Sequence, residues 1–177
     1  MPCPLPADCL NEMLENLGDD KITLHSCLLV SRLWCKISVR ILWRDIWRFK
    51  YSVTPNCQLE VASAILSTLI SCLPNESKEL IHNNEIFIST PTSKPPLFNY
   101  AAFCKVLSIY NIGEIIDHVL NGQRQCVVWQ GRIIKNRLVA KEILKMFMNQ
   151  ISSLKSLIYY SNYSNFDSSN ISFTNCP

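Results

Sequence analysis

The apolar positions at the start of the chain follow the period of amphipathic helices. In the first stretch they recur at i, i+3, i+4 and i+7, and these positions are Leu10, Met13, Leu14 and Leu17. A second stretch repeats the pattern at i, i+4, i+7 and i+11 with Val30, Trp34, Ile37 and Ile41. The two spacings predict helices over residues 7–16 and 31–42, each with one apolar face. Asp19 or Asp20 is positioned to cap a helix between them, over residues 21–29.

Three short helices of this composition carry more apolar surface than a unit of roughly 45 residues can bury. A surplus apolar face usually marks a partner site, so we expect docking rather than chemistry here. Leu5, Pro6 and Val30 are the strongest candidates for the exposed face, whereas Trp43 and Trp47 are expected to pack against the following part of the chain. Six further apolar residues fit a place in the core and a place in the interface equally well. They are Leu10, Leu14, Leu17, Leu24, Leu28 and Ile37.

The pattern after residue 50 predicts more helices and two short strands. Helical spacing covers the apolar positions before Pro74 and those between Leu138 and Ile151. Residues 90–96 contain three prolines, which exclude regular structure and mark a linker. In chain order we expect helices over 55–73, 78–82, 100–104, 112–120 and 138–151, and strands over 106–110 and 157–160.

Composition predicts a folded protein without catalytic or metal chemistry. Hydrophobic residues make up 48% of the 177 residues and charged residues 18%, which is typical of globular domains. No apolar run reaches the roughly 18 residues of a membrane span, and no signal peptide is visible, so we expect a cytoplasmic or nuclear protein. The nine cysteines form no C-x-x-C pair and are interpreted as buried thiols. Scattered histidines and isolated glycines indicate no enzyme, no metal and no cofactor.

Charge is divided between the predicted helices. All charged side chains in residues 1–20 are acidic, and they are Asp8, Glu12, Glu15, Asp19 and Asp20. Residues 21–50 are mainly basic, with a ladder at every fourth position made of Arg32, Lys36, Arg40, Arg44 and Arg48. We interpret this ladder as a solvated helix face, because the net charge is only +3 and no nucleic-acid-binding motif is present. Contact with an acidic partner surface is also compatible with it.

The first quarter of the chain resembles an F-box. The family pattern is a Leu-Pro pair, a helix with spaced apolar residues, a Val-(Cys/Ser)-x-x-Trp stretch and a closing Leu-Trp pair. The matching positions lie within residues 3–47 and are Leu5-Pro6, Leu10, Met13-Leu14, Leu17, Val30-Ser31-Arg32-Leu33-Trp34 and Leu42-Trp43. Met13-Leu14 stands where the family often has Ile-Phe, and Ser31 replaces the commoner Cys.

The resemblance implies a non-catalytic role in protein ubiquitination. F-box proteins dock onto a Skp-type adaptor, which connects them to a cullin scaffold in an SCF-type ubiquitin ligase, while a following domain holds a protein substrate. The residues that would contact the adaptor are Leu5, Pro6, Leu10, Met13, Leu14, Leu17, Leu29, Val30, Ser31 and Trp34. We expect no cofactor and no membrane contact, and we favour protein partners over nucleic acid.

The fold expected from these observations is mainly α. It consists of a three-helix F-box over residues 3–47 and a helical linker over 48–96 that ends in the proline-rich loop. Residues 97–177 form a short α/β segment similar to the start of a leucine-rich-repeat domain, and this segment looks incomplete. Two other functions stay open at this point. The first is an adaptor-binding scaffold or truncated competitor without a ligase role. The second is a basic nucleic-acid-binding protein.

Overall fold

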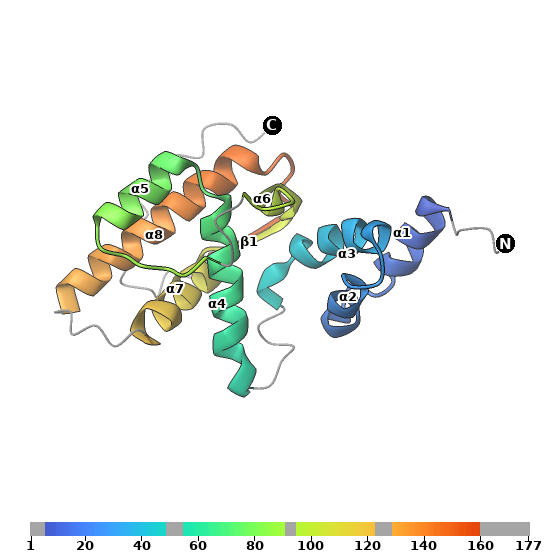
Figure 1. Cartoon of the computed structure of the whole chain (residues 1–177), viewed down its shortest axis with the longest axis horizontal. Coiled ribbons are helices and arrows are strands. Elements are labelled where there is room, and N and C mark those ends of the chain that lie inside the picture. The colour runs from blue at the N-terminus through green and yellow to red at the C-terminus, as the bar shows by residue number, and fades with distance from the viewer. Residues whose placement is uncertain (1–5, 49–54, 91–94, 123–128, 160–177) are drawn as a thin grey trace.

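A computed structural model describes residues 6–48, 55–90, 95–122 and 129–159, and these residues are mainly helical with one small parallel sheet (Figure 1). The chain begins with α1 (Ala7–Glu15), α2 (Lys21–Cys27) and α3 (Arg32–Arg44). The three helices predicted over the first 47 residues are therefore present. The helix expected over 31–42 extends two residues further, to Arg44.

Local polar contacts set the starts of the second and third helices. The carboxylate of Asp20 accepts hydrogen bonds from the backbone N–H and the hydroxyl of Thr23, at 3.0 and 2.6 Å. These bonds confirm Asp20 as the cap of α2 and lower the pKa of its carboxyl group. Ser31 caps α3, because its Oγ accepts from the backbone N–H of Trp34 at 3.3 Å.

The rest of the described chain is a second helical layer. The helix expected over 78–82 begins earlier, after Pro74, and the long helix expected from 138 begins at residue 129. Both helices start before their regular apolar spacing does, so the spacing alone placed their starts too late. The elements are α4 (Pro55–Cys72), α5 (Asn75–Asn83), α6 (Tyr100–Phe103), α7 (Ile109–Gly122) and α8 (Trp129–Gln150). Helix α4 packs against α6 and α7, and α5 packs against α8.

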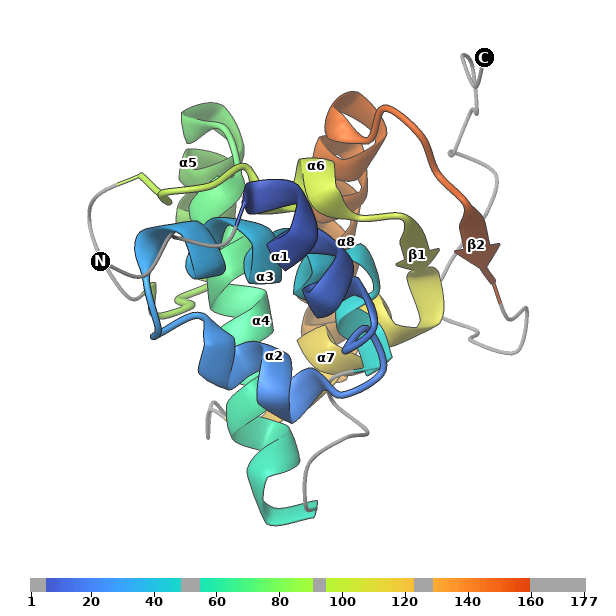
Figure 2. The same cartoon turned by 90° about the vertical axis from the view of Figure 1, so that its right-hand side faces the viewer.

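The parallel sheet pairs β1 (Val106–Ser108) with β2 (Ser156–Ile158), with Leu107 opposite Leu157 (Figure 2). The prediction that the first strand reaches residue 110 is wrong. It ends at Ser108 because the hydroxyl of this buried residue accepts from the backbone N–H of Asn111 at 3.2 Å, which caps α7. The second strand begins one residue before its predicted start, and its predicted end at residue 160 lies outside the described residues.

Two tryptophans connect the first three helices to the second layer. Trp43 and Trp47 are buried, at 6% and 2% exposure. The Trp47 indole N–H donates to the Val106 carbonyl oxygen at 2.6 Å, and the Trp43 ring lies 4.7 Å from the Tyr100 ring between centroids. Their predicted packing role is confirmed, and their partners come from β1 and α6, far along the sequence.

The cysteines follow their predicted role only in part. Cys104 is fully buried, and this burial raises the pKa of its thiol to about 12. Cys27 is also buried, whereas Cys9 lies exposed on α1, so the prediction of a buried thiol is wrong for Cys9.

In the described part of the chain, His, Cys, Asp and Glu form no group suited to a metal ion. None of the described helices is long and apolar enough to cross a membrane.

Candidate docking surface on the first three helices

The apolar face of α1 is divided between the core and solvent. Leu10 and Leu14 are buried, at 2% and 1% exposure, and belong to the core of the molecule. Met13 is 53% exposed, and Pro6 is exposed just before the helix, where its carbonyl oxygen accepts from the Leu10 N–H at 3.1 Å. Leu5 lies outside the described residues. On α1, Pro6 and Met13 are therefore the positions that offer surface to a partner.

The turn between α2 and α3 exposes two adjacent aliphatic side chains. Leu29 is 86% exposed and Val30 is 61% exposed. Their backbone N–H groups donate to the carbonyl oxygens of Ser26 and Cys27, at 3.1 and 3.3 Å. Ser31 follows at once as the cap of α3. The two side chains are thus presented on a hydrogen-bonded turn between two helices.

Two further exposed residues were missed by the sequence analysis. Ile22 is 59% exposed and Leu33 is 41% exposed. Ile22 lies in the first turn of α2 and Leu33 in the first turn of α3, so they belong to the two helices that this turn connects. The signal was available, because each residue falls outside the apolar stripe that marks the core face of its own helix. We define the α2–α3 apolar patch as Ile22, Leu29, Val30 and Leu33.

The other sequence-predicted site residues lie between core and surface. Leu17 and Trp34 are half-buried and pack against the core. Ser31 is exposed, but its hydroxyl is used in the cap of α3. The predicted set is thus not a single surface. Leu10 and Leu14 are in the core, whereas Leu29 and Val30 are strongly exposed.

Ion pairs join the acidic first helix to the basic third helix. The Arg44 guanidinium donates to both carboxylate oxygens of Glu15, at 2.6 and 2.7 Å. These bonds lower the pKa of the Glu15 carboxyl group and raise the pKa of Arg44. Arg48 pairs with Asp19 at 2.8 Å, where both side chains are largely exposed.

The basic ladder is therefore divided between α3 and the residues that follow it. Arg44 and Arg48 bind acidic residues of the first twenty positions. Arg32, Lys36 and Arg40 are exposed on the same helix, as expected for a solvated face. The exposed bases begin at the same end of α3 as the α2–α3 apolar patch, since Arg32 directly precedes Leu33 in the first turn of α3. A partner that covers the patch would meet positive charge next to it.

Binding is the chemistry that this surface can perform. Burying one aliphatic side chain of this size contributes about 1.5–3 kcal/mol, so Leu29 and Val30 together offer a substantial share of a micromolar affinity. Exposed apolar residues in a cluster are typical of interaction sites. Comparisons with protein-family models, with curated proteins and with solved structures gave no match for this chain.

Proposed function

We propose that this chain is a non-catalytic substrate-recognition subunit of an SCF-type ubiquitin ligase. In this proposal the first three helices act as an F-box, and the α2–α3 apolar patch docks onto a Skp-type adaptor that connects the chain to a cullin scaffold. One observation carries the proposal. Leu29 and Val30 are strongly exposed within the stretch that resembles the Val-(Cys/Ser)-x-x-Trp signature of the F-box.

The remainder of the chain would hold the substrate. A parallel pair of strands joined by helices supports a relation to leucine-rich repeats in the described part of residues 97–159. Two features differ from such a repeat. Two helices, α7 and α8, lie between the strands where one is usual, and Leu157 is 39% exposed rather than buried.

Binding to a purified Skp-type adaptor tests the docking step. We expect the immobilised adaptor to retain the wild-type chain and to lose a Leu29→Asp/Val30→Asp variant, because two carboxylates would replace the apolar contact. Leu97→Asp is the matched control, since Leu97 is 83% exposed but lies outside the first three helices. Circular dichroism melting of all three proteins would show that each is folded.

Equal retention of the wild type and the double variant would contradict docking through the patch, and so would retention of neither. Addition of a cullin–RING module, ubiquitin and the activating enzymes then separates two functions. A ligase subunit should support ubiquitin transfer to a co-purified protein. A scaffold or competitor should bind the adaptor without such transfer.

A further inference from the structure

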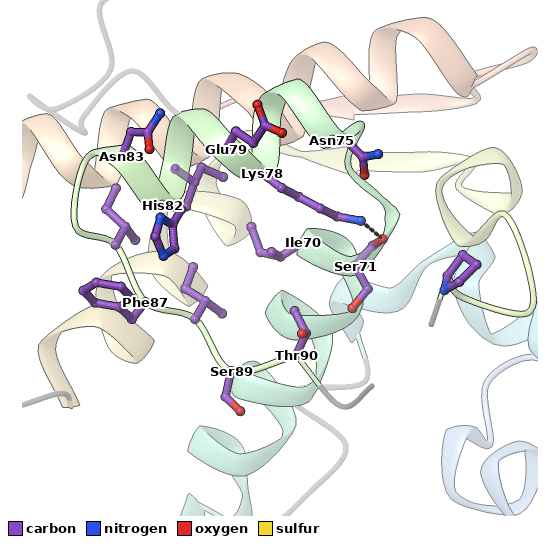
Figure 3. Close-up of a pocket in the computed structure, with 14 residues that line it drawn as sticks. Ile70, Ser71, Asn75, Lys78, Glu79, His82, Asn83, Phe87, Ser89 and Thr90 are labelled. Carbon is purple, nitrogen blue, oxygen red and sulfur yellow. Dashed lines mark hydrogen bonds between the residues drawn. The ribbon is translucent and has the colours of Figure 1, made fainter. Parts of the chain in front are cut away.

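A groove of about 870 Å³ lies between α4, α5 and the chain that follows α5. Figure 3 shows α5 along one side with Lys78 and His82, and the following chain along the other side with Phe87, Ser89 and Thr90. This volume lies within the range of known ligand pockets, about 300–1,000 Å³. The groove is separate from the first three helices, none of which contributes to its lining.

The groove has an apolar floor and a polar rim without strong net charge. Ile70, Ile81 and Ile86 line it and are buried, at 5%, 3% and 4% exposure. On the rim, Lys78 is held by donating its ammonium group to the Ser71 carbonyl oxygen at 2.8 Å, and Glu79 supplies the opposite charge. The lining therefore suits an uncharged ligand with apolar side chains.

The 86–90 segment has the burial pattern of an extended strand. Ile86 is buried, Phe87 is 54% exposed, Ile88 is half-buried and Ser89 is exposed, which is the two-residue alternation of a strand. Two contacts hold the segment against α5. The Ile86 N–H donates to the Ile81 carbonyl oxygen at 3.3 Å, and the Phe87 ring meets the His82 ring edge-on, with 5.5 Å between the ring centroids. In the described residues, strand pairing joins β1 to β2, and the 86–90 segment is not part of that sheet.

We propose that this groove binds an extended, uncharged peptide segment of another protein, which adds to the 86–90 segment as a second strand. Backbone hydrogen bonds would supply affinity, and alternate apolar side chains would enter the groove toward Ile70 and Ile81. A segment of β-branched and aromatic residues with strand-like burial, beside an apolar groove, suits such strand addition.

This inference goes beyond adaptor docking, because it concerns a different face of the molecule. The statement that the bound peptide belongs to a ubiquitination substrate rests on the proposed function, but peptide binding itself does not. The test below uses the full chain without any adaptor. Failure of one proposal would therefore leave the other unaffected.

The probe is a panel of capped, fluorescein-labelled seven-residue peptides that alternate Ile, Val or Phe with Thr or Ser. Binding to the full chain is measured by fluorescence polarisation. We expect saturable binding for members of the panel. The best peptide is then N-methylated at alternate residues in the two possible registers. Only the register whose N–H groups face the 86–90 segment should weaken binding, by about tenfold or more, because each backbone hydrogen bond contributes about fivefold.

A protein variant locates the site. Phe87→Ala should weaken binding about fivefold or more through lost apolar contact, whereas the matched control Leu97→Ala, also strongly exposed, should bind like the wild type. Three results would overturn the proposal. These are no saturable binding by any peptide of the panel, equal weakening by the two N-methyl registers, and equal affinity of Phe87→Ala and Leu97→Ala. Sedimentation that shows a dimer abolished by Phe87→Ala would instead identify a second copy of the chain as the occupant.

Discussion

The Arg44 guanidinium and the Glu15 carboxylate show how single residues join the first helices. Two hydrogen bonds of 2.6 and 2.7 Å connect them across 29 positions of sequence. The sequence predicts an acidic first stretch and a basic third one, since both are visible as charge blocks. Which acid meets which base depends on the crossing of α1 and α3, and local patterns carry no such information.

This pair predicts a specific pH dependence of stability. The pKa of Glu15 is lowered in the folded protein from its ordinary value of 4.5, so the stabilisation is present above that value and is lost as the pH falls through the lower folded pKa. Glu15→Gln should reduce the free energy of unfolding at pH 7 by about 0.2–1 kcal/mol, the range of partly exposed ion pairs. Urea titrations of both proteins at several pH values would measure this difference, which should shrink below pH 4.5.

Glu12→Gln is the matched control for that experiment, because Glu12 is exposed on the same helix and its side chain has no hydrogen bond recorded in the described structure. It should leave the free energy of unfolding close to the wild-type value at pH 7. A Glu15→Gln difference that persists unchanged to low pH would show that the ion pair is not its source.

At the scale of elements, helices with a regular apolar stripe were predictable and their ends were less so. The stripe through Leu10 and Leu14 located α1, and the stripe through Ile37 and Ile41 located α3, because helical period is a local property. The start of α7 was missed. It depends on the Ser108 hydroxyl, whose capping bond to Asn111 ends the strand before its apolar run is complete.

A buried polar contact fixes α5 on α8 and predicts a measurable loss of stability. The Ser77 hydroxyl donates to a carboxylate oxygen of Glu142 at 2.5 Å, and both residues are almost fully buried. Ser77→Ala would leave the carboxylate without this donor, so the free energy of unfolding should fall by about 1–3 kcal/mol. Chemical denaturation followed by circular dichroism would measure it. The exposed control Ser63→Ala on α4 should change it by less than about 0.5 kcal/mol. Equal effects would contradict the role of the contact.

At the scale of the whole molecule, α3 belongs to both layers. It packs against α1 and α2 in the first layer and against α6 in the second, and Figure 1 shows its last turns directed toward the second layer. Trp43 and Trp47 extend this connection to α6 and β1. The resemblance of the first segment to an F-box comes from its sequence alone. Its dependence on distant residues is not visible there, because those contacts join positions more than fifty residues apart.

A fragment of residues 1–48 should therefore fail to fold stably on its own. Separation would expose the buried side chains of Trp43, Ile46 and Trp47, and it would remove the indole hydrogen bond to Val106. Circular dichroism of the purified fragment should show low helix content and no cooperative thermal transition, in contrast to the full chain. A sharp transition at the temperature of the full chain would contradict this dependence.

The exposure of Leu29 and Val30 could not be predicted from the sequence, because the expected helix over residues 21–29 includes Leu29, whereas α2 ends at Cys27. Leu29 and Val30 are among the candidate residues and are exposed, while Leu10 and Leu14 are also candidates and are buried. Spacing alone cannot separate these cases, because a core stripe and a docking stripe have the same period. Only packing of the three helices against one another decides which side chains reach solvent.

Hydrogen–deuterium exchange of the full chain, with and without a purified Skp-type adaptor, tests the central proposal most directly. Docking through the α2–α3 apolar patch predicts slower exchange over residues 28–34 on adaptor binding, with exchange in α4 and α5 unchanged. The Leu29→Asp/Val30→Asp variant should show no such protection. Adaptor binding with unchanged exchange over residues 28–34, or protection confined to the second layer, would contradict the proposed docking surface.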